Sequence, residues 1–364
     1  MIAGTLVPRR TAAATAFGSA TPESVGFAPD LPRRFETLLA SGQLQNVHGV
    51  VALKKGRIVF ERYFTGTDAV WGGPPGTVKF KARTLHDMRS VTKSIVGLLY
   101  GIALSQGRVP APDQPLLAQF PEYPDLARDA NKARLTIAHA LTMTLALEWN
   151  DSAPWQTIPT EVEMEQAPDR YRFVLERPML GAPGKGWIYC GGATALLARL
   201  IERAAGTDLH AFAKAALFEP LGIDSTEWSR GRDGVPAAAS GLRLAPRDLA
   251  CIGQMIADGG KWAGRTIVPA DWLDASFRPA AIVDRQTHFG YHWYLGETAV
   301  RGRSGLYGAK WVAALGLGGQ CLFIFPDLEF VFAMTAGNYM APGPDQWKAP
   351  TAILTEVFLA SLDT

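Results

Sequence analysis

A serine and a lysine three residues apart carry the strongest chemical signal in the sequence. They are Ser90 and Lys93, in the segment Ser90-Val91-Thr92-Lys93 at the start of an apolar stretch. Residues three apart share one face of a helix, so the hydroxyl and the amine can come within hydrogen-bonding distance. A serine activated by an adjacent base attacks ester and amide carbonyls. The backbone N–H of Ser90, free at the helix start, can also bind the oxyanion that forms.

Lys93 must be neutral to act as the base. The ordinary lysine pKa of about 10.4 leaves roughly one molecule in 2,500 neutral at pH 7. The apolar neighbours Val91, Ile95 and Val96 are expected to lower the pKa of Lys93, because desolvation penalises the charged amine. The spacing alone also fits a solvated Ser90 that caps the helix and a Lys93 that extends into solvent. Further sequence is needed to separate the two interpretations.

The elements around this pair follow from hydrophobic periodicity. A helix is expected over 90–104, where apolar residues cover nearly the whole circumference and therefore indicate burial. Before it, a short amphipathic helix at 32–41 precedes two strands at 48–54 and 57–64. These strands flank a tight turn at 55–56 in which the glycine supplies the positive φ.

The middle third of the sequence indicates helices, and the last third returns to strands. Helical patterns occupy 136–147, 193–205 and 209–217, with no convincing strand between them. Strand patterns at 320–325 and 329–335 flank a Pro-Asp-Leu turn and precede a closing helix at 349–362. One sheet built from both ends of the chain and interrupted by a helical insertion is therefore expected. The predicted division is an arm at 1–28, an α/β sheet domain of 29–105 with 231–364, and a helical domain at 106–230.

Composition excludes several classes of protein. The 364 residues are 48% hydrophobic and 19% charged, which is typical of a compact protein with two domains. A net charge of +2 without a dense basic block argues against nucleic-acid binding. The sequence contains no run of 18 apolar residues, so no ordinary membrane-spanning helix is expected. The three cysteines are odd in number, widely spaced and without a Cys-x-x-Cys pair, so neither a disulfide framework nor a thiolate metal site is implied.

The first residues carry no clear signal peptide. Arg9-Arg10 could belong to an export signal, but only a weak Ala/Thr stretch follows where such a signal needs an apolar core. A cytoplasmic location is therefore slightly favoured over a periplasmic one. No pattern in the sequence sets an oligomeric state.

The surroundings of Ser90 resemble the serine β-lactamase-like family, which includes penicillin-binding proteins, class C β-lactamases, family VIII carboxylesterases and 6-aminohexanoate-dimer hydrolases. The similar segments follow in the family's order across about residues 45–340: LHDMRSVTKS at 85–94, LTIAHALTMT at 135–144, PGKGWIY at 183–189, LFEPLGI at 217–223 and SGLRLAPRDLA at 240–250. The resemblance implies an α/β (α+β) fold with a mostly antiparallel sheet flanked by helices. An all-helical domain is then inserted after the nucleophile helix, and the active site lies between the two parts.

The resemblance also implies roles for individual residues. Tyr189 is expected to take part in proton transfer and to titrate as a coupled pair with Lys93. The backbone N–H of Leu317 is expected to join that of Ser90 as the second oxyanion donor. Candidate substrate-binding positions are Trp187, Gly191, Gly316 and Gly318. The alternatives are a core tyrosine beside Trp187 and glycines that only permit close strand packing.

Two departures from the family pattern bear on the substrate. Tyr-Cys-Gly at 189–191 replaces Tyr-x-Asn, so the usual amide is absent. Ala-Leu-Gly at 314–316 stands in place of Lys-Thr-Gly or His-Thr-Gly, so a cation that binds substrate carboxylates, worth roughly 1.5–3 kcal/mol, is also absent. Lys310, Arg301 and Arg303 are the candidates to replace it. An esterase or amidase that prefers uncharged acyl groups is therefore expected over an efficient β-lactamase.

The sequence thus predicts a serine hydrolase that forms an acyl-enzyme with a small ester or amide substrate and needs neither a metal nor an organic cofactor. One alternative is a β-lactamase or D-amino-acid peptidase. Another is a non-catalytic ligand-binding or sensor protein on the same fold, because two of the three motifs have changed. His288 and His292 are four apart, but no glutamate follows His288 and the zinc-helix pattern is missing.

Overall fold

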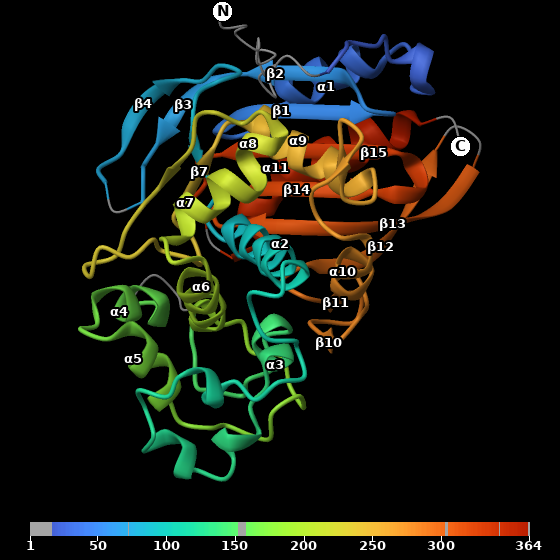
Figure 1. The fold of residues 1–364 in the computed structure, drawn as a ribbon. Helices are drawn as coiled ribbons and strands as arrows, with labels where there is room; N and C mark the ends of the chain where they lie inside the picture. Colours follow the sequence, from blue (N-terminus) through green and yellow to red (C-terminus); the bar gives the residue numbers. More distant parts are fainter. Residues whose placement is uncertain (1–16, 72, 152–157, 303–304, 342, 363–364) are drawn as a thin grey trace, which may run out of the picture.

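One large antiparallel sheet dominates the computed structural model, which describes residues 17–71, 73–151, 158–302, 305–341 and 343–362. The predicted features at Arg9, Arg10 and Arg303 lie outside these residues. The sheet has eight strands in the order β10-β11-β12-β13-β14-β15-β1-β2. Helices cover both of its faces, and a mainly helical region lies to one side (Figure 1).

The two ends of the chain build this sheet together, as the sequence predicts. Its strands are β1 (Val47–Lys54), β2 (Arg57–Tyr63), β10 (Ala281–Ile282), β11 (Thr287–Phe289), β12 (Tyr294–Gly302), β13 (Gly305–Gly316), β14 (Gln320–Phe325) and β15 (Phe330–Ala336). β1 pairs with β2 on one side and with β15 on the other, where Val51 lies opposite Ala333. The turn after β1 has positive φ at both Lys55 and Gly56, which is the twist that a two-residue hairpin requires.

Seven short strands form three smaller sheets. They are β3 (Thr65–Asp68) with β4 (Gly76–Lys79), β5 (His86–Asp87) with β7 (Leu242–Leu244) and β6 (Glu227–Trp228), and β8 (Lys261–Trp262) with β9 (Arg265–Thr266). β5 leads directly into the segment that contains Ser90 and Lys93.

The helices are α1 (Leu31–Ala40), α2 (Val91–Ser105), α3 (Ile137–Leu141), α4 (Thr160–Gln166), α5 (Arg170–Glu176), α6 (Gly191–Ala205), α7 (Leu209–Ala213), α8 (Glu219–Leu221), α9 (Pro246–Ala257), α10 (Ala270–Ser276) and α11 (Lys348–Ala352). Every named element between α2 and β6 in the described residues is helical. The domain boundaries at 106 and 230 stay a prediction. None of the described helices combines the length and the apolar character that a bilayer span needs.

Alternate residues of the central strands belong to two hydrophobic cores. Val51 and Leu53 of β1 pack into the core that contains α2 and α9, whereas Val50 and Ala52 pack into the core on the opposite face with α1 and the C-terminal helical segment. Side chains of a strand alternate between its faces, so a strand covered on both sides is buried along its whole length. This explains why four successive residues of β1, from Val50 to Leu53, are all apolar.

Two features of the sequence-based assignment are wrong. The helix expected at 136–147 ends at Leu141, because Met143 and Ala146 adopt left-handed φ values of 55° and 58° that end the helix. The apolar residues after Leu141 are buried in an irregular segment. The long hairpin of β12 and β13 was not anticipated from periodicity.

Candidate active site

Ser90 lies at the entrance of the buried helix α2, directly after a strained backbone position. Arg89 has a φ of 48°, which is left-handed and costly for a residue with a side chain. The backbone therefore turns sharply between β5 and α2. The Ser90 side chain is half-buried, whereas Lys93 one turn later is only 2% exposed. The nucleophile candidate is thus accessible and its lysine neighbour is shielded from water.

Lys93 makes three hydrogen bonds in this shielded position. Its Nζ donates to Ser90 Oγ at 3.1 Å, to Glu161 Oε2 at 3.0 Å and to the backbone oxygen of Ala239 at 3.0 Å. An ammonium group has three N–H donors, and all three are used here. The predicted contact between the serine hydroxyl and the lysine is present, and the two side chains share one face of α2.

The expected lowering of the Lys93 pKa is wrong. Burial acts to lower this pKa, but the charges of Glu161, Tyr189 and Asp151 outweigh it, and the Lys93 pKa lies above its ordinary value. Lys93 is therefore an ammonium at neutral pH. Sequence reasoning considered only the apolar neighbours of Lys93 on its own helix. The acidic groups arrive from α4 and from the segment before it.

Glu161 occupies the space that a side chain at position 191 would need. A Cβ atom added to Gly191 would lie 2.5 Å from Glu161 Oε2, so a larger residue at 191 would collide with the carboxylate. Asp151 fixes this arrangement, because it accepts hydrogen bonds from the N–H groups of Gly191 and Glu161, both at 2.9 Å. Burial and the nearby Glu161 charge raise the pKa of Asp151 to about 6. Sequence reasoning missed both acids; the absent amide at 191 was the one signal for them.

Tyr189 completes the group of polar side chains around the nucleophile. Lys93 Nζ lies 4.9 Å from the centre of its ring, and the Ser90 side chain is close enough to influence the pKa of its hydroxyl. Burial raises the pKa of Tyr189, while the Lys93 charge and the Ser90 side chain act in the opposite direction. The structure thus brings Ser90, Lys93 and Tyr189 together, as the motifs predict.

The end of β13 passes beside the backbone of the nucleophile segment. A Cβ atom on Gly316 would lie 2.4 Å from the Met88 carbonyl oxygen and 3.2 Å from Ser90 N, so this close approach requires glycine. Leu317 follows directly, and its N–H as an oxyanion donor stays a prediction. Gly318 is directed elsewhere: its N–H donates to Gln346 Oε1 at 2.8 Å.

An aromatic wall continues from Tyr189. The Trp187 ring lies 5.8 Å from that of Tyr189 and 5.6 Å from that of Phe289, measured between ring centres. Trp187 also lines a surface pocket of about 300 Å³, together with Lys185 and Ile282. The half-buried Trp187 therefore links the polar cluster to a pocket that polar and apolar residues line together.

The comparisons with known proteins agree with this geometry. A family model described as Beta-lactamase matches residues 32–354. The chain belongs to the beta-lactamase family. The fold class and the family resemblance predicted from the sequence are therefore confirmed.

The 6-aminohexanoate-dimer hydrolase of Paenarthrobacter ureafaciens is a relative of this beta-lactamase family member. The two are 25% identical over an alignment that covers 75% of this chain and 71% of the relative. Esterase EstB of Burkholderia gladioli is 28% identical over 55% of this chain and 51% of the esterase. A solved family VIII carboxylesterase aligns over 93% of this chain and 99% of its own, with a TM-score of 0.67 and 13% identity. At that identity the carboxylesterase supports the fold alone.

Two of the candidate replacements for the third-motif cation lie far from the site in this beta-lactamase family member. Lys310 is exposed on β13 opposite Glu297, six residues before Gly316, which is about 20 Å along an extended strand. Arg301 is paired opposite Leu306, further out on the same hairpin. Neither Lys310 nor Arg301 therefore restores the missing charge.

The two histidines weighed for a zinc site have separate surroundings. His292 is buried, and its ring nitrogens contact Thr194 Oγ1 and the Leu141 carbonyl oxygen, each at 3.0 Å. His288 lines the pocket beside Trp187.

Proposed function

We propose that this hydrolase-family protein cleaves ester or amide bonds of small substrates through an acyl-enzyme formed on Ser90. The observation that carries the proposal is the position of Lys93 Nζ, 3.1 Å from Ser90 Oγ and 3.0 Å from Glu161 Oε2. A hydroxyl, a cation and a carboxylate are thus connected in one chain of hydrogen bonds. Such a chain can remove the serine proton as the oxygen attacks a carbonyl.

The raised pKa of Lys93 makes the glutamate the final proton acceptor. Lys93 first passes one of its protons to Glu161, and the amine that this leaves then takes the proton of Ser90 as the oxygen attacks the carbonyl. The lysine is neutral only between these two transfers and is an ammonium again after them, so the resting enzyme does not need a neutral amine. The Tyr189 hydroxyl donates its proton to the leaving oxygen or nitrogen, and Lys93 and Glu161 return a proton to it. The net result is transfer of the Ser90 proton to the leaving group.

The oxyanion of the tetrahedral intermediate needs two N–H donors. Ser90 N at the start of α2 is one of them, and the helix N-terminus beside it favours negative charge. The N–H of Leu317, which follows the close approach of Gly316, is proposed as the other. Water then attacks the acyl-enzyme by the same proton path in reverse.

The surroundings support a substrate without a carboxylate next to the scissile bond. Lys310 and Arg301 lie too far away to bind one, and the aromatic wall at Trp187 offers apolar contact instead. One relative is named for hydrolysis of a 6-aminohexanoate dimer and another as an esterase, which supports amide and ester substrates for this chain as well.

Covalent labelling tests the nucleophile. A fluorophosphonate probe is expected to add its mass to the Ser90 peptide, and the Ser90→Ala protein is expected to remain unlabelled. A substrate panel of short-chain nitrophenyl esters, 6-aminohexanoate dimer, D-amino-acid peptides and nitrocefin then defines the class. Absence of labelling under every condition would indicate a binding or sensor protein. Rapid nitrocefin turnover with negligible ester hydrolysis would indicate a β-lactamase.

A further inference from the structure

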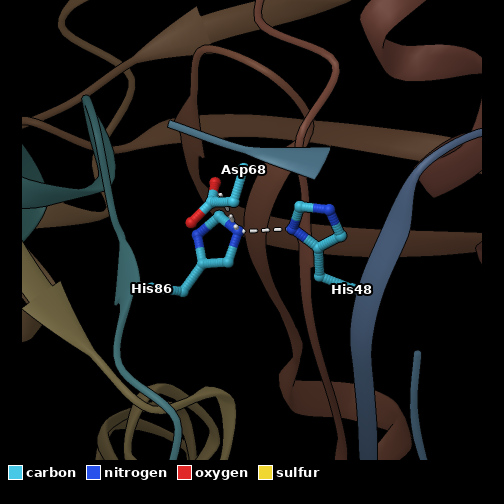
Figure 2. Close-up of side chains that lie close together, drawn as sticks. All are labelled: His48, Asp68 and His86. Atoms are coloured by element: carbon cyan, nitrogen blue, oxygen red, sulfur yellow. Dashed lines mark hydrogen bonds and ion pairs between the residues drawn. The ribbon is translucent and has the colours of Figure 1, made fainter. Parts of the chain in front are cut away.

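Three strands from three different sheets bring two histidines and an aspartate together in the protein interior. His48 lies on β1, Asp68 at the end of β3 and His86 on β5, and their side chains point toward one another (Figure 2). His48 and His86 are fully buried and Asp68 is 5% exposed. His48 Nδ1 is 2.8 Å from His86 Nε2, which is 3.6 Å from Asp68 Oδ1.

The outer nitrogen of each imidazole is committed as a donor. His48 Nε2 lies 3.0 Å from Asn46 Oδ1. The orientation of the Asn46 amide is fixed by Thr67, because Asn46 Oδ1 accepts the Thr67 N–H and Asn46 Nδ2 donates to the Thr67 carbonyl oxygen. His86 Nδ1 lies 3.0 Å from the carbonyl oxygen of Asp87. Both neutral rings therefore carry their proton on the outer nitrogen. The two inner nitrogens present lone pairs to each other.

Two lone pairs 2.8 Å apart repel each other unless a cation lies between or beside them. A shared proton is one solution, and it would leave a charged imidazolium fully buried beside Asp68. Neutral imidazoles and a carboxylate are instead the protein groups that ligate divalent transition metals.

We propose that His48 Nδ1, His86 Nε2 and an Asp68 carboxylate oxygen bind a divalent metal ion of the zinc class. The ligand atoms all lie within 4.8 Å of one another. Zinc–nitrogen bonds of about 2.0–2.1 Å at a tetrahedral angle place two nitrogens roughly 3.3–3.4 Å apart, so the imidazoles have to separate by about half an ångström. A water molecule would supply the fourth ligand.

The hydrogen bonds around the three ligands are of the kind that orient the ligands of metal sites. Metal-bound histidines donate their other N–H to a carbonyl or carboxylate oxygen, and bound carboxylates are themselves hydrogen-bonded. His48 and His86 bond to Asn46 and Asp87 in this way, and the Tyr339 hydroxyl donates to Asp68 Oδ1 at 2.8 Å. The sequence-based expectation of no metal considered the cysteines and the His288/His292 pair. Ligands 18 and 20 residues apart on separate strands carry no short motif.

The ion would be structural, because it joins β1, β3 and β5 behind the nucleophile. His86 lies four residues before Ser90. Tyr339, which binds Asp68, also lies under the Arg89 guanidinium at 4.5 Å from its ring centre. The ion would thus hold the strained turn at Arg89 in place without touching the substrate.

Metal content of the full chain tests the proposal directly. Protein prepared without a histidine tag is exchanged into 10 µM Zn²⁺ or Co²⁺, freed of excess ion and assayed by mass spectrometry of the metals. About one equivalent per chain is expected, with visible d–d absorption in the cobalt form. At Zn²⁺ concentrations about 100-fold above Kd, a rise in Tm of about 3 °C or more is expected, and Mg²⁺ should give none.

Matched variants assign the ion to this cluster. Asp68→Asn keeps an acceptor for Tyr339 but loses the charge, and it should weaken Zn²⁺ binding at least about tenfold, as should His48→Gln. His210→Asn is the control, since this half-buried histidine bonds to Thr226 outside the cluster and should bind zinc as the wild type does.

Two results would overturn the metal site. One is less than 0.1 equivalent of either ion in the wild type with no d–d bands, in which case a proton is shared by the imidazoles. The other is equal binding by the wild type, Asp68→Asn and His48→Gln, which would place the ion elsewhere. Both readouts are independent of Ser90 labelling, so the hydrolase proposal stands or falls separately.

Discussion

Replacing Glu161 by glutamine separates the proposed relay from a mechanism in which neutral Lys93 is the base. The substitution keeps the size of the side chain and an oxygen acceptor but removes the charge 3.0 Å from Lys93 Nζ. At an effective dielectric constant near 20, two unit charges at that distance attract by about 5.5 kcal/mol. Measured losses on breaking buried pairs are about 3–5 kcal/mol. The Lys93 pKa should therefore fall by roughly 2–4 units in the variant.

The pH profile of nitrophenyl ester hydrolysis is the assay. Without the carboxylate, only neutral Lys93 can take the Ser90 proton, so kcat/KM of Glu161→Gln at pH 7 should fall about 100-fold or more. It should then rise about tenfold per pH unit until the lowered Lys93 pKa is reached. Glu163→Gln is the control, because Glu163 is exposed on the same helix and its loss should leave the profile unchanged.

Loss of the Glu161 charge should also change the free energy of unfolding of the Glu161→Gln variant. In the wild type the raised Lys93 pKa contributes stability that is fully present below the unfolded value of about 10.4 and is lost at higher pH. In Glu161→Gln a buried ammonium is left without that partner, so urea unfolding at pH 7 should show a loss of about 3–5 kcal/mol, which diminishes only once the pH exceeds the lowered Lys93 pKa of the variant. A variant profile that superimposes on the wild type, or higher activity than wild type at pH 7, would refute the relay.

Three further outcomes are expected. Tyr189→Phe should lower kcat about 10²- to 10⁴-fold while the unfolding free energy changes little, and unchanged kcat would remove Tyr189 as the acid. Gly191→Ala places a Cβ 2.5 Å from Glu161 Oε2 and should lower kcat/KM about tenfold or more. Gly186→Ala is the control, because its Cβ would meet open space, and it should leave kcat/KM unchanged. Equal effects of the two substitutions would contradict the claim that Glu161 needs the space beside Gly191. The raised pKa of Asp151, about 6, makes its contribution to stability greatest below pH 4 and lost as pH rises through 6. The unfolding free energy of Asp151→Asn should not show this decline, which is of the order of 2–3 kcal/mol. Identical curves of unfolding free energy against pH for the variant and the wild type would contradict the raised pKa of Asp151.

Local patterns were sufficient for much of the fold. The helix that carries Ser90, the hairpin around Gly56 and the pair of strands near the C-terminus depend on periodicity and turn residues that neighbouring positions display. The assignment failed at 136–147, where left-handed residues end a helix although the apolar pattern continues. Burial of an irregular segment requires the same apolar residues as burial of a helix, so periodicity alone does not separate the two.

The candidate site divides in the same way. A hydroxyl and an amine one helical turn apart are a local relation, so the sequence by itself determined that Ser90 and Lys93 share a helix face and are able to meet. The protonation of Lys93 depends instead on Glu161, 68 residues later, and the pair of His48 and His86 meets across 38 residues. Electrostatic interactions and ligand contacts act through space, and only the tertiary structure decided which distant groups share that space. The residues next to Lys93 or His48 in the sequence therefore do not indicate which distant charged groups will lie beside them.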